Sequence, residues 1–204
     1  MDIRRRRALN TLVVTASATL VPVVSAHART PATSEGPFYP TDPMRFADRD
    51  NDLVKVEGRV RQAGGEVMHL TGTVSDRNDQ LRPGLRVEIW QCDANGRYLH
   101  TGDRSSIARD PDFQGFGFDI CNADGRYRFR TIKPVSYPGR PPHIHVKVLD
   151  GERELLTTQF YLADHPENGR DGLFRRMSRE QAQAVSMQLQ TVGDHLETEV
   201  NITL

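Results

Sequence analysis

Short runs of alternating hydrophobic and polar residues recur along most of the chain. An alternation of period two is typical of a β-strand with one buried face. Turn-forming Pro, Gly, Asn and Asp residues separate the runs, as in the tetrapeptides DANG and NADG. We therefore expect an all-β fold, an antiparallel β-sandwich with long loops around its active site. The expected strands cover residues 53–60, 68–74, 85–90, 126–132, 143–149, 155–161 and 197–204.

One segment has a helical pattern, residues 178–192 near the C-terminus. Ser178 is suited to the N-cap, and Gln181 follows three residues later, as in a capping box. Strands and helices do not alternate along the chain, which excludes a Rossmann-type fold. The prediction is one β-sandwich domain over residues 29–204 with a single short helix.

Residues 1–28 have the pattern of an export signal: four arginines, an apolar run and a final Ala-His-Ala. The apolar run is shorter than the roughly 20 residues of a membrane span, so we expect no stable span. The arginines also fit a twin-arginine signal. We expect cleavage near Ala28 and a periplasmic or secreted protein; an anchoring amphipathic helix is the alternative. Export would permit a disulfide between Cys92 and Cys121, and two buried thiols are the other interpretation.

Composition narrows the class of partner. The chain has 204 residues and a formal net charge of zero, so no strong field favours nucleic acid. The length suits one domain with a substantial core. Both a monomer and a homo-oligomer are compatible with these features.

The stretch YPGRPPHIH, residues 137–145, contains the clearest candidate chemistry. His143 and His145 are two residues apart in an expected strand, so they project from one face, and Ile144 projects into the core. Two adjacent imidazoles are a natural pair of metal ligands, although hydrogen-bonded histidines have the same spacing. Tyr137 and Tyr98 flank expected strands and offer phenolate oxygens, which suit ferric iron better than zinc. Taken singly, each tyrosine also fits an aromatic residue at the rim of a pocket.

Three segments carry a family resemblance: EGPFYP, IWQCDANGRY and ADGRYRFRTIKPVSYPGRPPHIH. Together they resemble the intradiol ring-cleavage dioxygenases, the family of protocatechuate 3,4-dioxygenase and catechol 1,2-dioxygenase. The resemblance runs from about residue 36 to residue 204. It implies an enzyme that cleaves a small aromatic diol between its hydroxyl-bearing carbons with O2, giving a cis,cis-muconate-type diacid.

The resemblance also implies roles for individual residues. A non-haem Fe(III) would be held by Tyr98, Tyr137, His143 and His145. Tyr137 would be displaced by the substrate and accept its proton, Arg140 would stabilise the electron-rich substrate, and Gln159 would orient it. The segment that would line the substrate pocket contains Gly36, Pro37 and Tyr39; a rigid lead-in packed on the sandwich is the alternative for these three.

Other functions remain compatible with the same fold. A copper or zinc enzyme built on the two histidines would need a further His or carboxylate ligand. A transthyretin-like or carbohydrate-binding sandwich would use the architecture without chemistry. An extradiol enzyme would need a two-histidine, one-carboxylate triad around Fe(II), and none is evident in the sequence.

Overall fold

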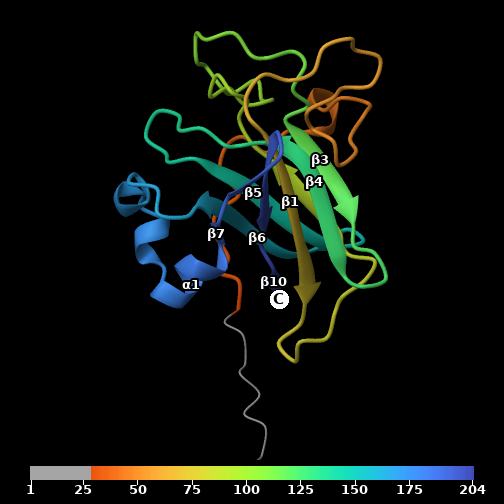
Figure 1. The fold of residues 1–204 in the computed structure, drawn as a ribbon, viewed down its shortest axis with the longest axis vertical. Helices are drawn as coiled ribbons and strands as arrows, with labels where there is room; N and C mark the ends of the chain where they lie inside the picture. The colour runs from red at the N-terminus through yellow and green to blue at the C-terminus, as the bar shows by residue number, and fades with distance from the viewer. Residues whose placement is uncertain (1–28) are drawn as a thin grey trace, which may run out of the picture.

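The alternating segments form two β-sheets that pack face to face (Figure 1). The computed structural model describes residues 29–204. The strands are β1 (Val67–Ser75), β2 (Arg86–Trp90), β3 (Phe116–Ile120), β4 (Arg126–Ile132), β5 (His143–Asp150), β6 (Arg153–Leu162), β7 (Ser186–Met187), β8 (Gln190–Val192), β9 (His195–Glu199) and β10 (Ile202–Thr203). The helical elements are α1 (Arg179–Ala184) and the 3-10 turns η1 (Asp42–Met44), η2 (Asn168–Arg170) and η3 (Phe174–Arg176).

The pairing of the strands confirms the predicted β-sandwich. One sheet has the order β3-β2-β5-β6-β7, and the other places β1 between β4 on one side and β9 and β10 on the other. Most pairs are antiparallel, but β1 runs parallel to β9 and β10, and β6 runs parallel to β7. Long loops, orange and yellow-green in Figure 1, gather at one end of the sandwich.

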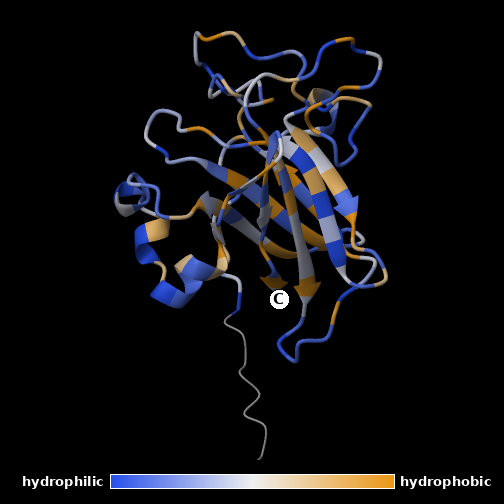
Figure 2. Ribbon diagram, viewed as in Figure 1, coloured by the Kyte–Doolittle hydropathy of each residue, from blue (hydrophilic) through white to orange (hydrophobic). Residues whose placement is uncertain are grey.

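The hydrophobic core lies between the inner faces of the two sheets. Strand β1 shows the alternation directly, because its even-numbered residues from Met68 to Val74 are buried, whereas its odd-numbered residues are only partly buried. Figure 2 shows the same alternation as stripes along the strands, whereas most loop residues are hydrophilic. The large, fully buried side chains of this core include those of Met68, Leu70, Ile89, Phe113, Tyr127, Ile132 and Phe160.

Two of the expected strands differ from the structure, and one observed strand was not expected. Residues 53–60 form no strand: Leu53 and Val54 are buried, but the isolated bridge to β4 lies just before the segment, at Asp52, and the chain has a positive φ at Gly58. Residues 197–204 form two short strands, β9 and β10. Strand β3 was not expected, since Gly117 interrupts its pattern. A Cβ at this glycine would lie 2.2 Å from the Asp50 carbonyl oxygen, so the packing excludes any larger residue.

The predicted helix is real but much shorter than expected. Ser178 and Gln181 form the capping box, and α1 ends at Ala184. Beyond it, the carbonyl of Val185 accepts a hydrogen bond from the Tyr161 N–H at 2.9 Å, and β7 joins the edge of β6. The free edge of a sheet therefore overrides the helical pattern in residues 186–192.

A buried glycine allows the C-terminal segment to pack on β1. A Cβ at Gly72 would lie 1.9 Å from the Val200 carbonyl oxygen and 2.7 Å from the Tyr127 hydroxyl, which donates to that same carbonyl at 2.6 Å. We expect Gly72→Ala to lower the free energy of unfolding by about 3 kcal/mol and Tm by roughly 6–12 °C, through overpacking and loss of this hydrogen bond. Thermal unfolding measures this. Gly172→Ala is the control, because its Cβ would meet nothing within 4 Å; equal Tm values would contradict the prediction.

Of the two interpretations of the cysteines, the structure shows the buried thiols and no disulfide between them. Cys92 and Cys121 are buried free thiols, and burial raises their pKa values to about 12 and about 11. The expected export signal, residues 1–28, lies outside the described residues. Within residues 29–204, no helix has the length and hydrophobicity that crossing a bilayer requires.

Candidate metal centre

The two histidines of β5 lie on the outer face of their sheet, opposite the core. His143 pairs in register with Tyr161, and His145 lies between Trp90 of β2 and Gln159 of β6. The indole of Trp90 stacks on the His145 ring, with centroids 4.8 Å apart and an interplanar angle of 11°. Trp90 is buried, as a core residue would be, but it lies outside the main core between the sheets. It belongs instead to a smaller cluster beneath the histidines and fixes the plane of one imidazole.

Three donor atoms converge above this face. The Nε2 atoms of His143 and His145 are 3.1 Å apart, and the Tyr98 hydroxyl oxygen is 3.4 Å from His143 Nε2. The Nδ1–H of His143 is positioned to donate to the Pro141 carbonyl oxygen at 2.7 Å, which leaves its Nε2 lone pair free. All three of these side chains are at least 98% buried.

The fourth predicted ligand comes from a tight turn. In Tyr137-Pro-Gly-Arg140 the backbone N–H of Arg140 donates to the Tyr137 carbonyl at 2.9 Å, and Gly139 has φ +84°. Proline followed by a glycine with positive φ is the signature of a type II turn. The Tyr137 ring contacts those of Tyr98 and His143, with centroids 5.4 and 5.6 Å apart. The turn therefore brings Tyr137 and Arg140 to the edge of the histidine pair.

Arg140 is held by a hydrogen-bonded chain. Its Nε donates to Asp171 Oδ2 at 2.7 Å, and its Nη2 donates to Gln159 Oε1 at 2.6 Å. The Tyr161 hydroxyl donates to the same Gln159 oxygen at 2.9 Å, and the Gln159 amide donates to the Ser34 carbonyl. The guanidinium therefore has a fixed orientation beside Tyr137, and the structure places both predicted residues, Arg140 and Gln159, next to the histidines.

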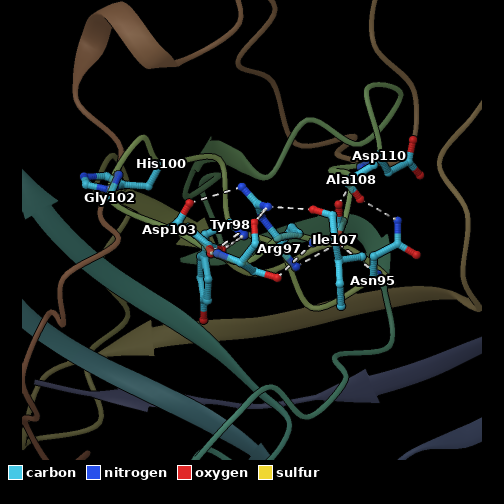
Figure 3. A network of polar contacts seen from close by, with 11 residues as sticks. Asn95, Arg97, Tyr98, His100, Gly102, Asp103, Ile107, Ala108 and Asp110 are labelled. Carbon is cyan, nitrogen blue, oxygen red and sulfur yellow. Dashed lines mark hydrogen bonds and ion pairs between the residues drawn. The ribbon is translucent and has the colours of Figure 1, made fainter.

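A polar network positions Tyr98 from behind (Figure 3). Its backbone N–H donates to Asp103 Oδ2 at 2.8 Å. The guanidinium of Arg97 donates to the carbonyl oxygens of Asp103, Ser105 and Ile107, which closes the loop. In Figure 3 the phenol of Tyr98 points away from this network, towards the strands. The loop is therefore held rigidly and fixes the position of Tyr98, one of the donors.

We expect Asp103→Ala to loosen the loop that positions Tyr98. The variant leaves the Tyr98 N–H without its acceptor, and loss of such a supporting partner typically costs about 10–100-fold in metal affinity or activity. Metal content after dialysis and the turnover rate would measure the loss. Asp124→Ala, in the remote turn between β3 and β4, is the matched control, and equal losses in both variants would contradict a role for Asp103.

Burial sets the protonation states of the donors. It lowers the pKa of His143 to about 4 and that of His145 further below its ordinary value, with the positive charge of Arg140 adding to both effects. Burial also raises the pKa of Tyr98 well above its ordinary value and raises the pKa of the half-buried Tyr137, and the positive charge of Arg140 opposes both shifts. Two neutral imidazoles therefore present lone pairs, and each phenol needs a nearby cation to ionise.

These residues fit a metal ion. Donor atoms that share an ion at about 2.1 Å lie roughly 3.0–3.5 Å apart, which matches the separations of His143 Nε2 from His145 Nε2 and from the Tyr98 oxygen. His145 Nδ1 has no hydrogen-bond partner in the described part of the chain, so its ring is not held by a competing contact. Tyr137 is only half buried, and it lines a surface cavity of about 230 Å³ together with Arg140 and Asp171. The centre therefore has three enclosed donors and one that is accessible from this cavity.

The predicted pocket segment splits into two parts. Gly36 has φ +76°, and a Cβ there would lie 3.3 Å from His145 Cε1, so this glycine touches the metal centre. Its neighbour Pro37 precedes Phe38, whose ring stacks on that of Tyr98 at 4.8 Å. Tyr39 turns away: its hydroxyl donates to the buried Glu88 at 2.6 Å, and its ring contacts Trp90. Tyr39 thus supports the cluster beneath His145.

Comparison with known proteins identifies the family. Residues 34–203 match the family model described as Dioxygenase, and solved structures that share the fold include an intradiol ring-cleavage dioxygenase from Tetranychus urticae. The chain belongs to the intradiol ring-cleavage dioxygenase family.

Two relatives of this chain match it over different shares of its length. The protocatechuate 3,4-dioxygenase beta chain of Burkholderia cepacia is 37% identical over 134 residues, 62% of this chain and 57% of the relative. Catechol 1,2-dioxygenase 1 of Acinetobacter lwoffii is 31% identical over 67% of this chain and 47% of the relative. The chain thus spans about half the length of these relatives.

One solved structure matches a larger part of this chain. It is the dioxygenase domain of a dioxygenase carbohydrate-binding protein fusion from Streptomyces sp. SirexAA-E. The two share 30% sequence identity with a TM-score of 0.66, over 87% of this chain and 98% of that one. The Tetranychus urticae enzyme, at 24% identity and a TM-score of 0.66, shows the common fold.

Several residues of the site were not expected from the sequence. Asp171 and Tyr161 hold the Arg140–Gln159 chain, and Phe38 covers Tyr98. The pairing of His143 with Tyr161 could have been found by extending the register of β5 against β6, whereas the position of Asp171 depends on the loop after β6. On the other sheet, His69, His195 and Glu197 form a two-histidine, one-carboxylate group that no local motif indicates.

Proposed function

We propose that the chain is a non-haem Fe(III) intradiol dioxygenase. It cleaves the ring of a catechol-type diol between the hydroxyl-bearing carbons with O2 and yields a cis,cis-muconate-type diacid. The observation that supports this most strongly is the convergence of two imidazoles with Tyr98, beside the accessible Tyr137. Phenolate oxygens are hard anionic donors that favour the ferric ion, so we propose Tyr98, Tyr137, His143 and His145 as its ligands.

The exposure of the four donors suggests how substrate enters. Tyr98, His143 and His145 are enclosed and would remain bound to the metal. Tyr137 is the accessible donor and faces the cavity, so we assign to it the exchange with substrate: its phenolate oxygen would take up one proton from the diol and become a neutral phenol. The chemistry that Fe(III) supplies when bound is withdrawal of electron density from the catechol ring, which makes the ring reactive towards dioxygen.

Arg140 and Gln159 would act on the bound substrate. The guanidinium is permanently charged and held at 2.7 Å by Asp171, so it is already oriented towards negative charge that develops on the ring oxygens. Gln159 offers its side chain at the same edge and fixes the Arg140 Nη2 group at 2.6 Å. These roles need no movement of the backbone.

A visible absorption spectrum tests the proposal. The purified protein should be red-brown from tyrosinate-to-Fe(III) charge transfer, and anaerobic catechol should shift the band to longer wavelength. A protein that stays colourless after Fe(III) reconstitution would overturn the ferric site and favour a transthyretin-like or carbohydrate-binding module. A coloured protein that consumes no oxygen with any catechol would overturn the enzyme while retaining the metal.

We also propose that the protein is exported. The support is the arginine-rich and apolar pattern of residues 1–28. N-terminal sequencing of the protein, produced in a host that has the export machinery, should find a start near Arg29. A full-length N-terminus in the cytosol would contradict export.

A further inference from the structure

A second group of metal-ligating side chains lies on the sheet that does not carry the Tyr and His donors. His69 is in β1, and His195 and Glu197 are in β9, where Glu197 is the register partner of His69. Met68 and Leu196 point into the core, so the three polar side chains share the outer face. The parallel pairing of β1 with β9 thus joins residues that are far apart in the sequence.

The three side chains are close enough to share an ion. The imidazoles of His69 and His195 stack with centroids 4.4 Å apart, and His195 Nε2 is 3.1 Å from Glu197 Oε1. One ligand atom from each residue lies within 4.8 Å of the other two. Ligands bound to one ion at about 2.1 Å lie roughly 3.0–3.5 Å apart, so side-chain rotation alone can close the set.

A neighbouring carboxylate favours this use of His195. Its Nδ1 is 3.2 Å from Asp194 Oδ1. A carboxylate that accepts from one ring nitrogen directs the lone pair of the other nitrogen towards a metal, an arrangement typical of metal-binding histidines. The nearby cation Arg130 is neutralised by two 3.0 Å contacts with Asp52. The local charge therefore favours a cation over an anion.

We propose that His69, His195 and Glu197 bind a divalent transition-metal ion of the Zn²⁺ type, at a site separate from the proposed ferric centre. Two imidazoles and one carboxylate are a donor set that zinc uses in proteins. The site opens on a cavity of about 260 Å³ lined by Gln188 and Gln190, which leaves a fourth position for water. A bound ion would fasten β9, and with it the C-terminal segment, to β1.

Zinc binding to the iron-loaded protein tests the proposal. Equilibrium dialysis against Zn²⁺, followed by metal analysis, should find one zinc equivalent beyond the iron in the wild type. His69→Gln and Glu197→Gln should weaken that binding by at least about 10-fold, because each removes one ligand. His165→Gln, a change of the same type away from the group, should bind zinc as the wild type does.

Thermal unfolding gives a second readout. Zinc at about 100 times the wild-type Kd should raise Tm of the wild type by roughly 5–10 °C, and it should raise Tm of the two ligand variants by no more than about half as much. Tm values in a chelator establish that the variants are folded. The absence of a second equivalent, or equal zinc affinity in all variants, would overturn the site. Iron content and ring cleavage are measured separately, so this result does not depend on the proposed ferric centre.

Discussion

Replacing His143 with alanine is expected to abolish ring cleavage and the charge-transfer colour together. His143 Nε2 lies at the meeting point of the site, 3.1 Å from His145 Nε2 and 3.4 Å from the Tyr98 oxygen. Removing a supporting partner costs about 10–100-fold, and removing a ligand should cost more, at least roughly 10³-fold in kcat/KM. Metal analysis, the visible spectrum and oxygen uptake with a catechol would each report the loss.

Two further variants make this result interpretable. His143→Gln keeps most of the side-chain volume, so it separates loss of the ligand from a packing defect in the buried site. His165→Ala removes a histidine whose Nδ1 accepts only a local backbone N–H, at 3.4 Å from Glu167, and should retain colour and activity. A folded His143→Ala protein with normal iron content would exclude this histidine as a ligand.

Replacing Arg140 with glutamine is expected to retain iron and colour but to lower kcat by about 10²–10³-fold, the usual effect of removing one group that stabilises developing charge. The guanidinium is not a metal donor, and its contacts with Asp171 and Gln159 show that it is oriented in advance. Because the lost interaction strengthens as negative charge develops, kcat should fall more than KM rises. Steady-state oxygen uptake across a range of catechol concentrations would separate the two parameters.

The control for this variant is Arg176→Gln, an exposed arginine in η3 that should behave as the wild type does. The Tm of Arg140→Gln also matters, since Asp171 loses its partner in that protein. A normal kcat in a folded Arg140→Gln enzyme would exclude the proposed role in charge stabilisation. A loss of colour would instead show that Arg140 supports the metal centre.

The sequence pattern predicts strands well where both a turn and a partner strand agree with it. Residues 126–132 alternate and follow the NADG turn, and they form β4 with those same bounds. Residues 53–60 also alternate, but the edge of β4 forms an isolated bridge only with Asp52, the residue just before them. Local alternation cannot reveal which edge is available, so the same signal succeeds in one place and fails in the other.

Trp90 shows a second limit of the pattern. Alternation assumes that one face of a strand is exposed, yet nearly all of β2 is buried, because the segment around Tyr39 covers its outer face. The lead-in to the domain was expected to contact substrate or to pack on the sandwich. The structure shows packing at Tyr39 and contact with His145 at Gly36.

The predictability of the site differs between its parts. The spacing of His143 and His145 alone indicates a pair of donors on one face. The approach of Tyr98 to them depends on a loop held by Asp103 and Arg97, and no local period encodes that approach. In the sequence, only the family resemblance predicts that the two tyrosines lie close to the two histidines. The group of His69, His195 and Glu197 could not be predicted from local spacing, because the parallel pairing of β1 with β9 brings these residues together.

Strand β5 has a consequence for how such a protein can change. Odd-numbered positions 143 and 145 carry the proposed chemistry, while Ile144 and Val146 lie in the core. Point substitutions can therefore alter reactivity and folding almost independently, one parity at a time. A single inserted residue in β5 would exchange the two faces and disrupt both properties at once. During evolution this strand can therefore accept substitutions, whereas an insertion or a deletion would disrupt it.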